Sequence, residues 1–119
     1  MEIWINPACS KCRSAKAALD EAGVTYTERR YLDDPPTVEE LAAVLARMGL
    51  EPWDIAREKE TREAGIALPR DAGHRAQWLA AMAARPTIIQ RPIVTADDGT
   101  TAIARDADSL APFLHPRAD

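Results

Sequence analysis

Over the first thirty residues the hydrophobic pattern changes from that of a strand to that of a helix and back to that of a strand. This order restricts the chain to few folds. Residues 3–5 form a short apolar run that ends at Asn6-Pro7, which predicts a buried strand followed by a turn. Alanine and leucine recur every three or four residues in 10–22, and Gly23 follows, so a helix is expected there. Residues 24–29 alternate in the manner of a second strand. Strand, helix and strand in this order predict a parallel βαβ unit.

The middle of the chain predicts further helices. Thr37 and Glu40 form a capping box ahead of an apolar stripe that ends near Gly49, which predicts a helix over this stretch. Residues 53–64 are polar and weakly periodic, which favours short helical pieces. Residues 74–84 carry apolar side chains on one face, so another amphipathic helix is expected there.

The last part of the chain predicts a hairpin and a closing helix. Residues 91–95 and 100–104 favour strands, and the Asp97-Asp98-Gly99 segment between them is typical of a turn. Residues 106–114 begin with an acid and carry an apolar face, which predicts a short helix against the sheet.

The order of these elements indicates the fold class. A chain of 119 residues has the size of one domain, so a single domain over 1–119 is expected. Strand, helix, strand, helical insert, strand, strand and helix together predict an α/β, thioredoxin-like (glutaredoxin-like) fold. The helical insertion is expected at approximately 36–84, between the N-terminal strand-helix-strand unit and the C-terminal hairpin and helix.

Charge and hydropathy exclude several classes of partner. The formal net charge is -4 and no dense basic run is present, which argues against a nucleic-acid partner. No apolar run approaches the roughly 20 residues that a membrane span needs, and the first residues lack the features of a signal peptide. We therefore expect a soluble, cytoplasmic protein with no nucleic-acid or membrane partner.

Two closely spaced cysteines are the strongest chemical feature of the sequence. Cys9 is expected at the start of the first helix, where backbone N–H groups of residues 10–12 and the cations Lys11 and Arg13 favour a thiolate. This context favours reactive thiol chemistry over the alternative that Cys9 and Cys12 are small buried core residues. A metal site is not expected, because zinc needs about four ligands and the separation of the only other candidates, His74 and His115, matches no familiar zinc-finger or zinc-ribbon spacing.

Three motifs occur in a fixed order along the chain. They are Asn-Pro-Ala-Cys-Ser-Lys at 6–11, Tyr-Leu-Asp-Asp-Pro-Pro-Thr at 31–37 and Arg-Pro-Ile-Val at 91–94. Together they resemble the glutaredoxin-linked arsenate reductase family, over nearly the whole chain. The resemblance implies the thioredoxin-like fold that the order of elements predicts.

The resemblance also implies roles for individual residues. Cys9 matches the nucleophilic cysteine of the family, and Pro92 matches its cis-proline. Arg57, Arg91 and Arg105 match the three arginines that surround the nucleophile. Planar guanidinium groups suit arsenate, a tetrahedral anion, because they hold its oxygens with charge-assisted hydrogen bonds.

The reaction that the resemblance implies is the reduction of arsenate to arsenite. Arsenate docks among the arginines, with Arg13 as a fourth candidate for binding it, and the Cys9 thiolate attacks arsenic. A second thiol then reduces the adduct. In this family the electron donor is glutathione with glutaredoxin, so we expect glutathione or another low-molecular-weight thiol as co-substrate and no bound cofactor.

Two positions depart from the family pattern. Cys12 stands where the best-known members carry a non-thiol residue such as serine. A second thiol either forms an internal disulfide with Cys9, which shifts the electron donor toward thioredoxin or mycothiol-like thiols, or acts as a redox switch. Ile5 stands where those members often place a histidine that helps to lower the pKa of the cysteine.

A second resemblance supports a different functional class. The Cys-x-x-Cys pair and the downstream Arg-Pro-Ile are also similar to the Spx-type regulators, thioredoxin-fold proteins that bind RNA polymerase and sense disulfide stress. Under that alternative Cys9 and Cys12 are a sensor pair, and the helical insertion is a partner surface. A thiol oxidoreductase with another substrate is the third alternative. The segments 6–8 and 35–37 favour the arsenate reductase.

Overall fold

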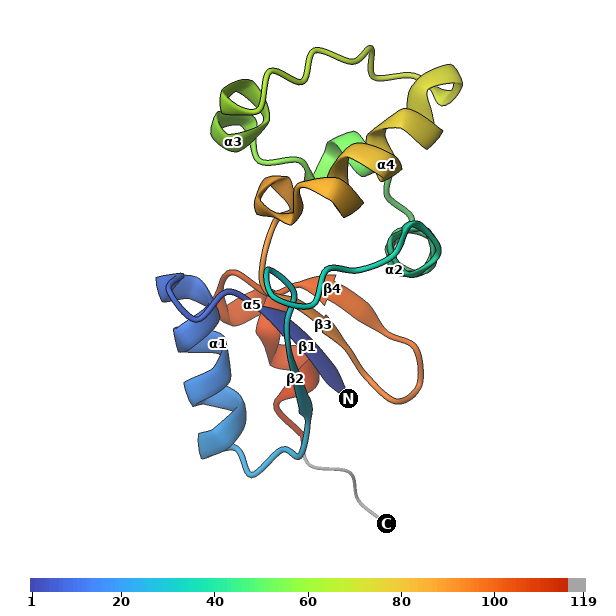
Figure 1. The fold of residues 1–119 in the computed structure, drawn as a ribbon. Helices are drawn as coiled ribbons and strands as arrows, with labels where there is room; N and C mark the ends of the chain where they lie inside the picture. The colour runs from blue at the N-terminus through green and yellow to red at the C-terminus, as the bar shows by residue number, and fades with distance from the viewer. Residues whose placement is uncertain (116–119) are drawn as a thin grey trace. The chain divides into compact units, whose positions relative to one another are not determined.

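The computed structural model describes residues 1–115, which form two compact units (Figure 1). The first unit contains residues 1–31 and the described residues from 91 onward, and the second contains residues 32–90. The second unit includes the predicted insertion at approximately 36–84 and extends beyond it at both ends. The single domain over 1–119 stays a prediction, and its last four residues lie outside the described part of the chain.

The first unit is built on a four-stranded sheet. Its strands are β1 (Glu2–Ile5), β2 (Thr27–Arg30), β3 (Ile93–Thr95) and β4 (Thr101–Ile103). The strand order is β2-β1-β3-β4, in which β1 is parallel to β2 and antiparallel to β3, and β3 is antiparallel to β4. The predicted βαβ unit and the predicted hairpin are both confirmed.

Two helices cover one face of this sheet (Figure 1). They are α1 (Ser10–Glu21) and α5 (Ala107–Leu110), the latter followed by a 3-10 turn, Ala111–Phe113. Side chains alternate between the two faces of a strand, so Ile3 and Ile5 of β1 enter the same core. The core consists of Ile3, Ile5, Cys12, Ala15, Leu19, Val94, Ala104, Leu110 and Phe113. This arrangement confirms the α/β, thioredoxin-like fold class.

The second strand begins later than its sequence pattern suggests. The alternation in 24–29 predicts a strand, whereas β2 covers Thr27–Arg30. Pairing starts where Glu2 meets the first residue of β2, so the residues before it have no strand beside them. Val24 and Tyr26 nevertheless pack against the core, which explains the alternating pattern.

The second unit is helical. Its α-helices are α2 (Val38–Met48), α3 (Glu58–Glu63) and α4 (Arg75–Ala84), and its 3-10 turns are Pro52–Ile55, Ala72–His74 and Pro86–Ile88. α2 packs against α4, and the buried side chains of the unit include Leu41, Leu45, Trp78 and Met82. The helices predicted for this region are confirmed, including the short pieces in 53–64.

Both ends of α2 follow from local sequence. The Thr37 hydroxyl accepts the Glu40 N–H at 3.1 Å, and the Glu40 carboxylate accepts the Thr37 N–H at 3.0 Å. At the other end Gly49 takes a φ of 67°, a left-handed conformation that residues with a Cβ adopt only at a cost. The predicted capping box and the predicted end of this helix near Gly49 are both confirmed.

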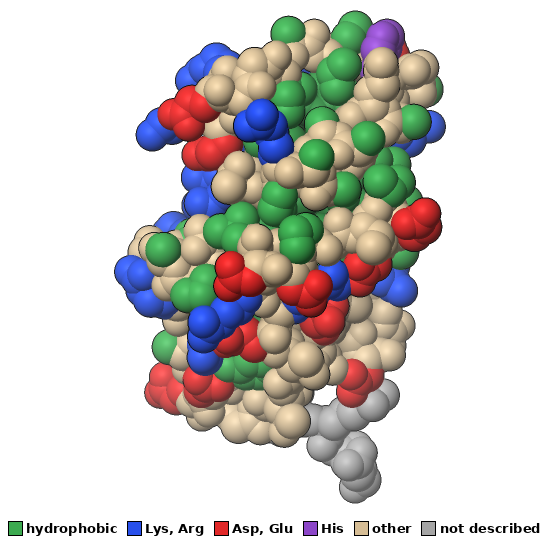
Figure 2. All heavy atoms as spheres, viewed as in Figure 1, with side chains coloured by type: hydrophobic (Ala, Val, Ile, Leu, Met, Phe, Trp, Pro, Cys, Tyr) green, Lys and Arg blue, Asp and Glu red, His purple; other side chains and the backbone are tan. Residues whose placement is uncertain are grey.

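The surface mixes charges of both signs. On the face drawn in Figure 2, Lys and Arg side chains are interspersed with Asp and Glu side chains. None of the helices in residues 1–115 has the length and the apolar character required to cross a bilayer.

Candidate active site

Cys9 occupies the N-cap position of α1, just past the carboxyl end of β1. Its backbone N–H donates to the Asn6 carbonyl at 2.9 Å, and its carbonyl accepts the Arg13 N–H at 3.0 Å. No side chain caps α1, and its first turn holds no acidic residue. The first N–H groups of the helix therefore face the Cys9 sulfur without a competing carboxylate.

The pKa of the Cys9 thiol is lowered from 9.0 to about 7. Partial burial is the largest single influence and raises this pKa. The backbone N–H groups of Cys12 and Lys11 and the side chain of Arg91 favour the thiolate, and together these influences outweigh burial. The lowered pKa agrees with the sequence prediction. However, the cation that acts on the sulfur is Arg91, whereas the helix context in the sequence predicted this role for the side chains of Lys11 and Arg13.

Cys12 lies in the first turn of α1 and is fully buried, with 0% of the residue exposed. Its pKa is raised to about 11, first by burial and then by the charge and hydrogen bond of Cys9. The Asn6 N–H opposes this effect by donating to Cys12 Sγ at 3.4 Å. Both cysteines are free thiols. A partly ionised Cys9 and a protonated Cys12 therefore share this site at neutral pH.

Arg91 reaches the Cys9 sulfur from the loop that precedes β3. The Arg91-Pro92 peptide bond is cis, as the resemblance implies for Pro92. The Arg105 side chain donates through Nη1 to the Arg91 carbonyl oxygen at 2.6 Å. The first unit thus brings the two cysteines and Arg91 together, and Arg105 binds the backbone of the same loop.

Arg13 is exposed and binds the turn that leads to Cys9. Its Nη1 donates to the Pro7 carbonyl at 3.2 Å. A hollow of about 310 Å³ adjoins this turn, and its lining includes Pro7, Cys12, Arg13, Lys16 and Arg30. Arg13 thus lies near the thiols, and its part in binding a substrate stays a prediction.

Arg57 belongs to the second unit. It precedes α3, where its backbone N–H donates to the Ile88 carbonyl at 2.7 Å. Its Nε donates to the Glu60 carboxylate at 2.8 Å, and the side chain is 23% exposed. The predicted place of Arg57 beside Cys9 stays a prediction.

Sequence reasoning missed Asn6 as a residue of the site. Its carbonyl holds the Cys9 N–H, its own N–H donates to Cys12 Sγ, and its side-chain oxygen accepts the Ala8 N–H at 3.0 Å. The Asn-Pro dipeptide signals this turn, because an asparagine side chain readily accepts the N–H two residues later. From the sequence, Asn6-Pro7 predicts only the end of a strand.

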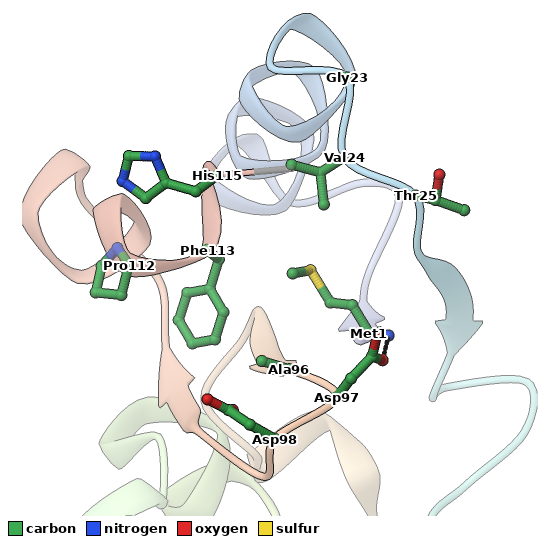
Figure 3. A pocket seen from close by; sticks show the side chains of 10 residues that line it. All are labelled: Met1, Gly23, Val24, Thr25, Ala96, Asp97, Asp98, Pro112, Phe113 and His115. Carbon is green, nitrogen blue, oxygen red and sulfur yellow. Dashed lines mark hydrogen bonds and ion pairs between the residues drawn. The ribbon is translucent and has the colours of Figure 1, made fainter. Parts of the chain in front are cut away.

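A second hollow lies at the amino end of β1, away from Cys9. It has a volume of about 440 Å³, and Figure 3 shows the side chains of Met1 and Phe113 turned toward its interior. The Met1 amino group pairs with Asp97, as the dashed line marks. The residues that line it include none of the predicted site residues. Among residues 1–115, no group of three or more His, Cys, Asp or Glu side chains is placed to hold a metal ion.

Comparison with known proteins places the chain in a family. Residues 4–113 match the model of the ArsC family. The chain belongs to the ArsC family. It is 31% identical to an arsenate reductase of Neisseria meningitidis, over 96% of this chain and 97% of that protein. It is also 56% identical to an uncharacterized protein in the glnII region of Streptomyces viridochromogenes, over 96% of this chain and 98% of that protein. The solved structure of an arsenate reductase from Vibrio cholerae matches with a TM-score of 0.81 and 30% identity, covering 95% of this chain and 98% of that one.

Membership of the ArsC family confirms the resemblance that the three motifs carry. Within this family member, Ile5 is 3% exposed and belongs to the core, so this position contributes packing rather than an ionisable group. The lowered pKa of Cys9 is reached without a histidine there, through backbone N–H groups and Arg91. The alternative function, that of a redox-sensing regulator that binds RNA polymerase, stays a prediction.

Proposed function

We propose that this ArsC-family chain reduces arsenate to arsenite, with Cys9 as the nucleophile. The observation that carries the proposal is the Cys9 sulfur, which lies at the N-terminus of α1 beside the Arg91 side chain. The Neisseria meningitidis relative and the Vibrio cholerae structure are both named arsenate reductase, which supports an enzyme of this kind.

Arg91 binds the arsenate oxygens next to the attacking sulfur. A guanidinium carries five N–H donors, so Arg91 can hold the thiolate and an oxyanion together. Arg105 positions the Arg91 loop through its hydrogen bond to the Arg91 carbonyl, and its remaining donors serve the substrate. Arg13 and Arg57 complete the set of substrate-binding arginines under this proposal.

The reaction proceeds through a covalent adduct of Cys9. The thiolate attacks arsenic, a sulfur–arsenic bond forms, and an arsenic–oxygen bond breaks with loss of the oxygen as water after protonation. A second thiol then attacks the Cys9 sulfur. The sulfur–arsenic bond breaks, its electron pair stays on arsenic, and arsenite leaves. Glutathione or another low-molecular-weight thiol supplies the electrons, with glutaredoxin or thioredoxin as the protein donor.

An assay of arsenite formation tests the proposal. The chain is supplied with arsenate and either glutathione with glutaredoxin or thioredoxin with its reductase. Cys9→Ser should lower the rate by about 10³-fold or more, because no other group replaces the nucleophile. Ser14→Ala, at an exposed position of the same helix, serves as the control and should change the rate by less than about two-fold. Full activity of Cys9→Ser would reject the proposal.

A further inference from the structure

Cys12 is a thiol that the reaction above leaves unused, although it lies in the same helix turn as the nucleophile. Cys9 is the N-cap residue of α1 and Cys12 is the third residue of that helix. The Asn6 backbone binds both: its carbonyl accepts the Cys9 N–H at 2.9 Å, and its N–H donates to Cys12 Sγ at 3.4 Å. Both thiols are free, and a Cys-x-x-Cys pair at the start of a helix is the arrangement of redox-active dithiols.

Burial gives the two thiols different access to reagents. Cys9 is partly exposed, whereas 0% of Cys12 is exposed although the residue borders the hollow of about 310 Å³. Arsenate and dissolved thiols can therefore reach Cys9 but not the Cys12 sulfur. Cys12 lies within the same helix turn as the Cys9 sulfur.

We propose that Cys12 is the resolving thiol of the reaction: it attacks the Cys9 sulfur of the arsenic adduct, releases arsenite and leaves a Cys9–Cys12 disulfide. This inference rests on the proposed function and replaces its external second thiol with a group of the chain itself.

The site changes in favour of this attack once the adduct forms. In the free enzyme, the negative charge of Cys9 and its hydrogen bond both raise the pKa of Cys12. The charge on the Cys9 sulfur itself ends when this sulfur is bonded to arsenic. The Asn6 N–H and the charge of Arg91, which lower the pKa of Cys12, remain. These two groups favour the Cys12 thiolate, which is the form that attacks.

The step balances in atoms and electrons. Cys12 gives up its proton to solvent, and its sulfur forms a bond to the Cys9 sulfur. The sulfur–arsenic bond breaks, and its electron pair reduces arsenic from the +5 to the +3 state, which leaves as arsenite. The two thiols are oxidised to one disulfide. An external dithiol, such as that of a thioredoxin-type protein, then returns the disulfide to two thiols by exchange at the accessible Cys9 sulfur.

A single-turnover experiment without external thiol tests this inference. The reduced chain is freed of reductant, mixed with arsenate in the absence of oxygen and quenched in acid. Arsenite is measured, and free thiols are counted by alkylation of the denatured chain. The wild-type chain should release stoichiometric arsenite and lose both thiols. Cys12→Ser and Cys12→Ala should release arsenite at least about 100-fold more slowly, because they lack the adjacent attacking group.

Two controls separate position from thiol content and from folding. Cys12→Ser combined with Ser14→Cys keeps two thiols but moves the second to an exposed site further along α1, and it should behave like Cys12→Ser alone. Far-UV circular dichroism checks that each variant is folded. The thiol count of the wild-type chain tests the inference without any substitution. It therefore remains a valid test even if the variants at the buried position of Cys12 do not fold.

A parallel assay with glutathione and glutaredoxin makes the outcomes distinct. Under the inference, the Cys12 variants regain arsenite formation when these donors are added. If the wild-type chain keeps both thiols or holds arsenic on Cys9 until glutathione arrives, Cys12 does not resolve the adduct, while the proposed function stands. If no form of the chain produces arsenite with any donor, the proposed function fails and the inference fails with it.

Discussion

The first N–H groups of a helix have no partners within it, and the N-termini of α1 and α2 differ in what they place beside these groups. At α2, Thr37 and Glu40 satisfy each other's backbone N–H groups, and Glu39 and Glu40 place negative charge in the first turn. At α1, Cys9 takes the N-cap position without a capping hydrogen bond from its side chain, and the first turn has no acid. The start of α2 serves stability, whereas the start of α1 leaves its N–H groups to the Cys9 sulfur.

This difference shows where the chain gives up stability for chemistry. A serine or threonine at the N-cap is worth about 1 kcal/mol over a residue that cannot cap. α1 lacks that contribution and has a thiol with a lowered pKa instead. The four predictions that follow test whether the contrast between the two helix starts is as large as the geometry indicates.

The largest expected effect comes from Arg91, the cation beside the first turn of α1. Arg91→Ala removes a charge-assisted hydrogen bond to the Cys9 sulfur, which is worth about 1.5–3 kcal/mol. We expect kcat/KM for arsenate to fall by about 10–100-fold, and the pKa of Cys9 to rise from about 7 toward 9.0. The rate of iodoacetamide labelling against pH measures the pKa.

Arg47→Ala, at an exposed position near the end of α2, is the matched control and should leave both quantities unchanged. An Arg91→Ala chain with the wild-type labelling profile would show that the helix N–H groups alone lower the pKa of Cys9.

The second prediction moves the thiol from one helix start to the other. In a Cys9→Ser background, Thr37→Cys places a thiol at the N-cap of α2, where Glu39 and Glu40 oppose its negative charge. Its pKa should lie near the free value of about 8.5, so its thiolate fraction at pH 7 is about 15-fold below that of Cys9. Labelling rates of the two folded chains compare them directly. Equal rates at pH 7 would mean that any helix N-terminus suffices.

The contrast between the helix starts was only partly visible in the sequence. The capping box of α2 is local, because Thr37 and Glu40 lie three residues apart, and it was predicted correctly. The burial of Cys12 also has a local signal, since Cys12, Ala15 and Leu19 recur at three- and four-residue spacing. The apolar stripe predicted for this helix contained only alanine and leucine.

Contacts between distant parts of the sequence are what residue patterns could not supply. Arg91 meets Cys9 because β3 pairs beside β1, and only the family resemblance connected the two residues beforehand. The hydrogen bond from Arg105 to the Arg91 carbonyl depends on the β3–β4 pairing in the same way. The late start of β2 is likewise set by where β1 begins. Spacing along the chain carries no information on these long-range distances.

The third prediction concerns stability without chemistry. Thr37→Ala removes the capping box of α2 and should lower the free energy of unfolding by about 1 kcal/mol, roughly five-fold in the folding equilibrium. The labelling profile of Cys9 should not change. Urea unfolding followed by far-UV circular dichroism measures the first quantity, and iodoacetamide labelling measures the second. A shift in the labelling profile would show that the two helix starts are not independent.

The smallest effect is the stability that α1 should gain when its thiol is replaced by a better cap. Cys9→Ser introduces a hydroxyl that can accept an N–H of the first turn, and at pH 5 we expect a gain of about 0.5 kcal/mol. The gain should shrink as pH rises. The folded pKa of Cys9, about 7, lies below its ordinary 9.0, so the thiolate stabilises the folded wild-type chain increasingly between these two values. At pH 9 the native thiolate should therefore outweigh the advantage of serine, and the wild-type chain should be the more stable of the two. Urea unfolding of both chains at the two pH values measures the difference, and a gain that is equal at pH 5 and pH 9 would mean that the fold does not favour the Cys9 thiolate.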